Sequence, residues 1–209
     1  MAMEIEMRAR FDRDAHDRLL SRLERDGEDL GRDDKQIYFY VLPDKLLKVT
    51  DNIAAGSAKI TLKANRIGRG PAFPETEIPI ARQDVAAAVR IFSGLGFASR
   101  MHEAFNRRHN FRFDGVEIAV KWSEAWGFHA EFEVLLDDPP PGRTDQPARS
   151  ALDDAEARIR AVAAELDVPL MSERELADFT AAFEAAERDR RAGAARAASP
   201  STERPPGEH

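Results

Sequence analysis

Polar and apolar residues alternate along the first stretch of the chain, from Met3 to Arg10, and predict a β-strand there. Successive side chains of a strand point to opposite faces of the sheet. Glu4, Glu6 and Arg8 therefore share one face, and the apolar residues between them take the other. An ordinary solvated polar face gives the same pattern, so this strand alone does not indicate a site.

A second pair of acids with the same spacing lies near the end of the strand-rich part of the chain. Glu131 and Glu133 alternate with Ala130, Phe132 and Val134. Many basic residues lie between the two acid pairs. The two pairs together predict one polar interior, enclosed by the sheet, that holds a metal ion and a phosphate chain.

Seven further stretches show the signs of β-strands, which are alternation, β-branched and aromatic residues, and turn residues at their ends. They are residues 36–42, 46–50, 58–65, 75–80, 105–113, 115–122 and 127–136. With the first strand, they make about eight mostly consecutive strands. Eight antiparallel strands can close into a barrel that leaves no edge exposed. We therefore predict an α+β fold, an eight-stranded antiparallel closed β-barrel with flanking helices.

Apolar residues spaced three and four apart predict the helices that flank this barrel. Their approximate ranges are residues 14–26, 84–95 and 150–166, and a last helix begins after Ser172. Asp12 is placed to cap the first helix, and Ser172 with Glu175 forms a capping box for the last. Residues 68–71 and 137–142 are rich in Gly or Pro and predict loops.

The end of the chain differs from the rest in composition. From about Arg190 onward it contains Ala, Arg, Ser, Pro, Gly and Glu without an apolar stripe. Such a stretch buries too little apolar surface to offset the entropy of ordering it. We therefore divide the chain into a folded domain at residues 1–188 and a disordered tail at residues 189–209.

Composition narrows the class of protein. The 209 residues carry a net charge of −7 and include no cysteine. Disulfides and thiolate metal sites are therefore excluded, and an acidic chain is not typical of a general nucleic-acid binder. No signal-peptide pattern is visible, and no apolar stretch approaches the ~20 residues that span a bilayer. We expect a cytoplasmic protein with neither nucleic acid nor a membrane as partner.

Several short motifs follow one another along the chain. They are Glu4-x-Glu6-x-Arg8, Tyr38-Phe39, Lys48, Thr61-Leu62-Lys63, Glu77, Leu95-Gly96-Phe97, Arg108 with Phe111, and Trp126-Gly127 through Glu131-Phe132-Glu133. In this order they resemble the motifs of CYTH proteins, the triphosphate tunnel metalloenzymes. The resemblance covers about residues 3–185. The Leu-Gly-Phe helix end and the last strand are most similar to the class IV adenylate cyclase branch.

Some positions depart from the pattern of that family. They are Tyr40 in place of Asp, Thr50 in place of the second Arg of its strand, Glu75 in place of the Arg of Arg-x-Glu, Asn106 in place of Lys, and Lys121 in place of Asp. Arg8 in place of Lys keeps the charge but changes the donor geometry. Several cations that would face phosphates are therefore absent, and two positions carry the opposite sign.

The resemblance implies a triphosphate site that depends on Mg²⁺ or Mn²⁺, and Mg²⁺ prefers oxygen ligands. The expected metal ligands are Glu4, Glu6, Glu77, Glu131 and Glu133. The cations expected to bind the phosphates are Arg8, Lys48, Lys63, Arg108 and Lys121. Glu4, Glu6 and Arg8 are the expected catalytic residues. Scattered salt bridges among these residues are the alternative interpretation.

Other kinds of site have weaker support. His109 and His129 have no second His at ligand spacing, so a structural or solvent-exposed role is favoured over metal binding. No Gly-rich phosphate loop with a following Lys is present, which argues against a P-loop ATPase. Without cysteine there is no thiol nucleophile.

The sequence therefore predicts an enzyme that processes a small-molecule triphosphate inside the barrel. Attack by water would make it a triphosphatase. Attack by a ribose hydroxyl would make it a nucleotide cyclase that releases pyrophosphate. The competing hypothesis is a non-catalytic binding module for a phosphorylated ligand, since the departures at Thr50, Glu75 and Asn106 remove expected cations. The oligomeric state stays open, with a homodimer as one arrangement.

Overall fold

The computed structural model describes residues 3–64, 72–136 and 149–198, which form nine β-strands and four α-helices. The strands are β1 (Met3–Arg10), β2 (Glu28–Arg32), β3 (Lys35–Val41), β4 (Leu46–Asn52), β5 (Ser57–Lys63), β6 (Ala72–Ile80), β7 (Met101–Phe113), β8 (Val116–Ser123) and β9 (Gly127–Leu136). The helices are α1 (Arg13–Asp26), α2 (Val85–Phe92), α3 (Arg149–Glu165) and α4 (Glu173–Ala198). The loops predicted at residues 68–71 and 137–142 lie outside the described residues.

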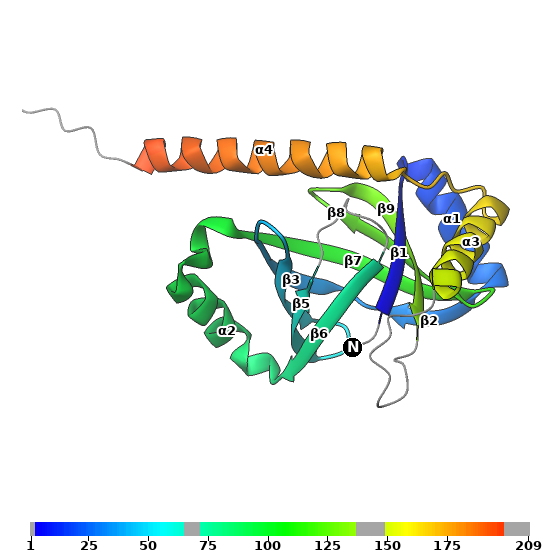
Figure 1. Ribbon diagram of the computed structural model, residues 1–209, viewed down its shortest axis with the longest axis horizontal. Coiled ribbons are helices and arrows are strands. Elements are labelled where there is room, and N and C mark those ends of the chain that lie inside the picture. Colours follow the sequence, from blue (N-terminus) through cyan, green and yellow to red (C-terminus); the bar gives the residue numbers. More distant parts are fainter. Residues whose placement is uncertain (1–2, 65–71, 137–148, 199–209) are drawn as a thin grey trace, which may run out of the picture.

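The strands form one antiparallel sheet that curls on itself (Figure 1). Its order is β2-β7-β3-β4-β5-β6-β1-β9-β8, and β8 also pairs with β7. The prediction of a closed barrel is wrong, because the sheet is an open, curled half-barrel. The reason lies at the seam between β1 and β6, where residues 3–5 pair with residues 72–74 while the rest of β6 pairs with β5. Because only three residue pairs join β1 to β6 in the described chain, the remaining residues of the two strands are not paired with each other.

β2 is the strand that sequence periodicity does not predict. Its residues, Glu28–Arg32, are mostly charged and exposed, and Leu30 is their one aliphatic side chain. Within the described chain β2 pairs with β7 alone, and the register shifts between Asp29 and Gly31. Its ladder is therefore held by backbone hydrogen bonds and cross-strand ion pairs rather than by a buried face, and neither leaves a period-two pattern.

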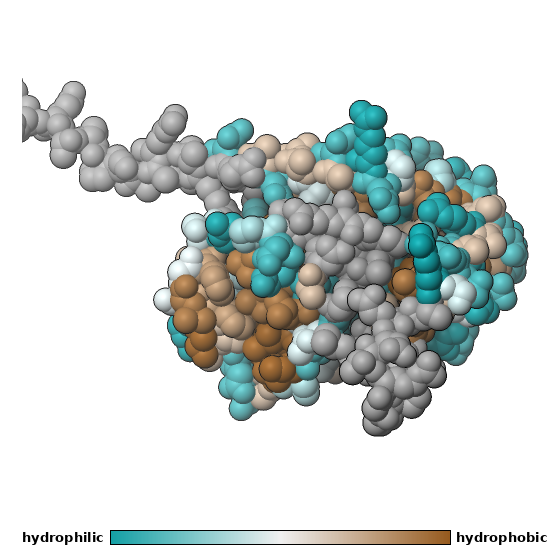
Figure 2. Space-filling view, in the orientation of Figure 1, coloured by the Kyte–Doolittle hydropathy of each residue, from teal (hydrophilic) through white to brown (hydrophobic). Residues whose placement is uncertain are grey.

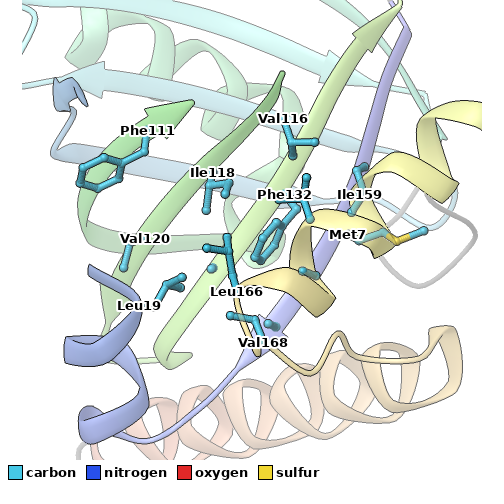
Figure 3. Close-up of a cluster of buried hydrophobic side chains, with 14 of the residues drawn as sticks. Met7, Leu19, Phe111, Val116, Ile118, Val120, Phe132, Ile159, Leu166 and Val168 are labelled. Atoms are coloured by element: carbon cyan, nitrogen blue, oxygen red, sulfur yellow. The ribbon is translucent and has the colours of Figure 1, made fainter. Parts of the chain in front are cut away.

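The larger core lies on the outer face of β1, β7, β8 and β9, beneath α1 and α3 (Figure 3). Phe111, Ile118 and Phe132, from three neighbouring strands, are fully buried there. They pack with Leu19 of α1 and Ile159 of α3. Burial of these apolar side chains is the main force that holds the helices on the sheet.

A smaller core lies on the outer face of β3, β4 and β5, beneath α2. Tyr40, Leu47 and Val49 from the sheet pack there with Val85 and Ala88 from the helix region. Tyr40 is fully buried, and its hydroxyl donates a hydrogen bond to the carbonyl of Val89 at 3.2 Å. Tyr40, which replaces an Asp of the family pattern, therefore belongs to this core and not to the interior.

Exposed apolar residues lie on α2, on the segment that follows it and on β6. Figure 2 shows brown, apolar surface gathered over α2 and the neighbouring part of β6. Ile78, Ile91 and Leu95 are 57%, 60% and 64% exposed. Ile91 stays outside the core because the opposite side of α2, with Val85 and Ala88, already packs on the sheet.

α4 crosses beyond the ends of the strands and then projects away from the body (Figure 1). It continues to Ala198, ten residues beyond the predicted end of the folded domain at residue 188. Alanine and arginine favour helix without needing a buried face, which explains why this stretch lacks an apolar stripe. Residues 199–209 of the predicted tail lie outside the described residues. Among the described residues, no helix is long and apolar enough to cross a membrane.

Candidate functional site

The strand register brings the side chains predicted for the site onto one inner face. Glu6 lies opposite Glu133, and Arg8 lies opposite Glu131. The same face continues through the register of every neighbouring pair of strands around the half-barrel. It carries Glu4, Glu6, Arg8, Lys48, Lys63, Glu77, Arg108, Lys121, Glu131 and Glu133. The period-two alternation of each strand thus becomes one polar concave surface.

Lys63 of β5 lies among three carboxylates, and we call this group the Lys63 cluster. Its Nζ is 2.9 Å from Glu4 Oε2, 3.4 Å from Glu6 Oε2 and 2.5 Å from Glu75 Oε1. Burial by itself would lower the pKa of Lys63, but the Glu6, Glu4 and Glu75 carboxylates outweigh it and raise that pKa above its ordinary value. The Lys63 cluster holds one ammonium and three carboxylates, so it has an excess of negative charge.

Glu131 of β9 lies among three cations, and we call this group the Glu131 cluster. Its oxygens are 2.6 Å from Lys121 Nζ, 3.2 Å from Arg8 Nε and 3.6 Å from Arg108 Nη1. Burial would raise the pKa of Glu131, but Lys121, Arg8 and Arg108 hold it well below its ordinary value. This cluster therefore has an excess of positive charge.

Arg8 joins the two clusters. Its guanidinium contacts Glu6 on its own strand as well as Glu131 across the ladder. The ring of Trp126 lies 5.6 Å from the guanidinium carbon, at cation–π distance. The side chain of Arg8 is 7% exposed. The planar guanidinium has donors in fixed directions and can bind two carboxylates at once. A lysine ammonium is a compact charge and does not fix the direction of its partners in this way.

Two further charged groups of the inner face lack a close partner. Within the described chain, neither Glu133 nor Lys48 has an oppositely charged group within 4.0 Å. Burial, with repulsion from Glu4 and Glu6, raises the pKa of Glu133 to about 8. Burial, with repulsion from Lys63, lowers the pKa of Lys48 to about 8. The charge of each group is therefore not offset by a close neighbour of the opposite sign among the described residues. A ligand that carries the opposite charge would stabilise the charged form of the group.

Glu77 does not join the other acids. It is exposed on β6, where Lys59 Nζ lies 2.6 Å from its Oε1 and Thr61 Oγ1 donates to the same oxygen at 3.0 Å. These neighbours lower the pKa of Glu77 despite partial burial. Among the described residues, Glu77 is thus the one acid predicted for the site that pairs with a partly exposed lysine, Lys59, apart from both clusters.

Asp33 is a polar residue of the interior that sequence reasoning missed. Its Oδ2 is 2.6 Å from Lys35 Nζ and 3.6 Å from Arg108 Nε, and it accepts a hydrogen bond from Asn110 at 3.2 Å. Asp33 precedes β3 and has no periodic pattern around it. Its role in orienting Arg108 becomes visible only when β3 and β7 lie side by side.

The positions that depart from the family pattern also lie on the inner face, Tyr40 excepted. Thr50 and Asn106 are buried, at 4% and 7% exposure. Glu75 pairs with Lys63, and Lys121 pairs with Glu131. The two reversed charges therefore lie in opposite clusters, and each has its own partner. Glu75 belongs to the site although the sequence marked it only as a departure.

His129 is buried beside these clusters. Its Nδ1 lies 2.9 Å from the carbonyl oxygen of Gly127. Burial and the nearby Lys121 lower the pKa of His129 to about 3, so the imidazole is neutral at physiological pH. It packs at 5.4 Å against the ring of Trp126. These contacts favour a structural role for His129, as the sequence predicted.

α4 lies over the end of the half-barrel next to Arg8. Phe179 packs edge-on against Trp126 at 4.7 Å, and the Arg10 guanidinium lies 4.0 Å from the centre of the Phe179 ring. One turn further along, Phe183 reaches His102 at the start of β7, 5.8 Å away. The helix thus spans from β1 and β9 to β7 at this end of the interior.

The donor set of the interior suits a divalent cation chemically. Glu4, Glu6 and Glu133 supply carboxylate oxygens, and their mutual repulsion, seen in the raised pKa of Glu133, is what a bound cation relieves. Among the described residues, however, no group of three or more carboxylates or imidazoles could hold a metal ion as the side chains stand. Glu4 and Glu6 bind Lys63 and Arg8 instead.

Comparison with solved structures identifies the fold. A protein from Pyrococcus horikoshii OT3 matches 83% of this chain and 93% of its own at 23% identity, with a TM-score of 0.62. A Vibrio parahaemolyticus protein proposed to be an adenylate cyclase covers 83% of this chain and 91% of its own at 18% identity, with a TM-score of 0.56. A Hippeastrum protein, proposed as an adenylyl cyclase and described as having a dominant triphosphatase activity, covers 81% and 90% at 16% identity, with a TM-score of 0.54.

At these identities the similarity concerns the fold. No family model matches the sequence, and no curated protein matches it significantly. The CYTH-like fold predicted from the ordered motifs is confirmed, since the matching structures include proteins proposed as adenylate cyclases.

Proposed function

We propose that this protein processes a triphosphate on the inner face of its half-barrel, with a divalent cation, Mg²⁺ or Mn²⁺. One observation carries the proposal: a cation-rich cluster around Glu131 and an acid-rich cluster around Lys63 lie side by side and share Arg8. A phosphate chain with a chelated metal has the complementary two parts: its anionic oxygens match the cation-rich cluster, and its metal ion matches the acid-rich cluster. Separate, oppositely charged subsites are what such a ligand requires.

The cation-rich side would bind the phosphate chain. Arg8, Arg108 and Lys121 present their donors toward a single carboxylate, Glu131. Oxygens of a phosphate can take the same donors in charge-assisted hydrogen bonds, and guanidinium groups do so with two parallel bonds. Asp33 would keep Arg108 oriented toward the interior. Lys48, which has no close anionic partner among the described residues, would bind a further phosphate oxygen.

The acid-rich side would hold the metal. Glu4 and Glu6, with Glu133, are the carboxylates available for it, and Glu77 is separated from them by its own pair with Lys59. When bound there, a divalent cation would offset negative charge that develops on the phosphoryl oxygens during transfer. Lys63 and Arg8 would then move their donors from carboxylates to phosphate, so the resting ion pairs keep the interior charge-balanced until the ligand arrives.

The attacking group decides the reaction. If water attacks, the products are a diphosphate and phosphate, or a monophosphate and pyrophosphate, and the protein is a triphosphatase. If a ribose hydroxyl of the substrate attacks its own α-phosphorus, the product is a cyclic nucleotide and pyrophosphate leaves. The solved structures with this fold include a protein described as having a dominant triphosphatase activity, which favours testing hydrolysis first.

A non-catalytic binding module is the second candidate. The favouring observation is that Lys63, Arg8 and Lys121 are already engaged with carboxylates. A site of this kind can exchange one anion for another without transferring a phosphoryl group. Its ligand would be a phosphorylated small molecule of about the size of a triphosphate.

A substrate panel distinguishes the two candidates. The protein is incubated with nucleoside triphosphates, thiamine triphosphate and tripolyphosphate, each with Mg²⁺, with Mn²⁺ or with EDTA, and the products are identified by chromatography. We expect metal-dependent release of phosphate or pyrophosphate from at least one triphosphate. Binding of a triphosphate by calorimetry without any turnover would instead support the binding module. Turnover of equal rate in EDTA would contradict the metal dependence.

A further inference from the structure

The two clusters of the interior have opposite charge imbalance. Three carboxylates surround the ammonium of Lys63, and three cations surround the carboxylate of Glu131. Two of these groups also have a partner outside their own cluster, since Glu6 contacts Arg8 and Arg108 lies near Asp33. A ligand that carries only negative charge matches the second cluster and is repelled by the first. The interior therefore selects for ligands by how their charge is distributed and not only by its total.

Glu75 creates the imbalance of the Lys63 cluster. It lies on β6 directly opposite Lys63 of β5, and its Oε1 makes the shortest of the three contacts to Nζ, at 2.5 Å. Its side chain is only 16% exposed, so solvent screens this contact weakly. Glu4 and Glu6 alone would leave the cluster with two carboxylates. Glu75 adds the third, and it also fixes the ammonium of Lys63 within the cluster, away from an incoming phosphate.

We propose that Glu75 is a specificity-determining residue, which makes the interior bind a polyphosphate chain as its divalent-cation chelate in preference to the free anion. The inference rests on the proposed function, because it assumes that the inner face is where the chain binds. It assigns a role to the residue at which this sequence reverses the sign of the family pattern.

Electrostatics gives the direction of the preference. A free polyphosphate brings only negative charge to a site where three carboxylates already face one ammonium, in a setting shielded from water. The chelate brings its cation with it, and that cation can replace Lys63 as the partner of the carboxylates. Lys63 then becomes available to the phosphate. Without the Glu75 charge, Lys63 would bind the free anion directly.

Glu77 offers a matched control. It lies two residues along the same strand and on the same inner face, and it pairs with Lys59 instead of Lys63. Glu77→Gln removes the same charge from the protein as Glu75→Gln does. A difference between the two variants therefore reports the local effect on Lys63 and not the change in net charge.

The test is calorimetric titration with a non-hydrolysable probe, the bis-methylene analogue of tripolyphosphate, with EDTA or with excess Mg²⁺. We expect wild type to bind the Mg²⁺ chelate at least about tenfold more tightly than the free anion, a difference of about 1.4 kcal/mol. In Glu75→Gln this ratio should fall below about threefold, mainly through tighter binding of the free anion. Glu77→Gln should keep the wild-type ratio. Unfolding curves check that both variants are folded.

Each outcome bears on a different statement. If wild type binds free anion and chelate equally, or if Glu77→Gln lowers the ratio as much as Glu75→Gln, the role given to Glu75 is wrong while the proposed function stands. If wild type binds neither form, the proposed function itself fails. The comparison within wild type needs no variant, so it decides the preference even if Glu75→Gln is unstable.

Discussion

At the scale of single residues, the interior depends on a few side chains that each serve two partners. Arg8 bridges Glu6 and Glu131, and Lys63 bridges Glu4 and Glu75. Breaking a buried pair leaves a charge without compensation, and this costs more than the pair itself contributes. Substitutions in these clusters should therefore alter both stability and ligand binding, and the two effects must be measured separately.

Glu6→Gln separates the proposed metal chemistry from phosphate binding. The amide keeps the size of the side chain but removes a carboxylate, so turnover of the best triphosphate should fall at least about tenfold, which corresponds to ~1.4 kcal/mol in the barrier. Affinity for the phosphate chain in EDTA should stay the same or rise, because one repelling charge is gone. Steady-state kinetics and calorimetry give the two values. Full activity of a folded Glu6→Gln variant would show that Glu6 is not part of the metal site.

Glu133 should make stability depend on pH. Its folded-state pKa, about 8, lies above the ordinary value of 4.5 because of burial and of repulsion from Glu4 and Glu6. The folded protein therefore keeps a proton that the unfolded chain releases. The resulting stability is fully present below pH 4.5 and is lost as pH rises through 8, by up to about 1.4 kcal/mol per pH unit.

Glu133→Gln should remove this loss. Urea unfolding of wild type and variant, in EDTA and from about pH 5 to about pH 8, measures the difference in slope. All other titrating groups are common to both proteins, so the difference isolates Glu133. Parallel curves would mean that the carboxylate of Glu133 is ionised at no cost in the folded protein.

At the scale of elements, tight turns position the strands that carry the site. The turn between β7 and β8 contains Asp114 and Gly115, both with positive φ, of 44° and 70°. Arg158 of α3 donates to the carbonyl of Asp114 at 2.9 Å and lies against Gly115. This turn thus sets the register that places Arg108 opposite Lys121, and it also docks a helix on the larger core.

Gly115→Ala should destabilise the protein more than the same change at Gly56. Both glycines have φ near +65° to +70°, so both substitutions carry a strain of about 1–2 kcal/mol. At Gly115 the new methyl group would also displace the Arg158 guanidinium, whereas nothing lies within 4 Å at Gly56. Thermal unfolding of the two variants measures the difference. Equal melting temperatures would show that the Arg158 contact contributes little.

At the scale of the whole molecule, the half-barrel presents one polar concave face, and two apolar clusters hold helices on its outside. α4 is attached differently, by ring contacts of Phe179 and Phe183 at the end of the interior. The backbone of Met171, just before α4, donates to the carbonyl of Arg8 at 2.8 Å and ties the start of the helix to β1. The docking of α4 is thereby coupled to the strand that carries the catalytic candidates.

Phe179→Ala should loosen α4. It removes the contacts with Trp126 and Arg10, a loss of about 1–2 kcal/mol. Hydrogen exchange along residues 173–186 should become faster while the sheet stays protected. Asp178→Ala, at an exposed position in the same turn, is the control and should leave exchange unchanged. Unchanged exchange in Phe179→Ala would show that other contacts hold the helix.

Truncation after Arg190 should leave global stability nearly unchanged. The ring contacts that dock α4 lie before this point, and the sequence beyond it has no apolar stripe. We expect the melting temperature to shift by less than about 2 °C. Calorimetry of the shortened chain measures this. A larger decrease would mean that the end of the chain packs against the domain.

The sequence by itself determined the local features. Alternation of polar and apolar residues located eight of the nine strands and the side of each on which its charged residues lie, because a strand reverses its side chains at every residue. The spacing of the pairs Glu4 and Glu6 and Glu131 and Glu133 led to the prediction of one shared polar interior. Caps and apolar spacing located the helices. Only β2, which has no buried face, and the end of α4, which needs none, left no signal.

The tertiary structure decided what depends on contacts between distant strands. Whether the sheet closes is set by the length of the β1–β6 seam, and three paired residues leave it open. Which charges meet is set by register and curvature, so Glu75 joins Lys63 while Glu77, two residues away, does not. Such pairings join residues far apart in the chain, and a period of two carries no information about the partner strand.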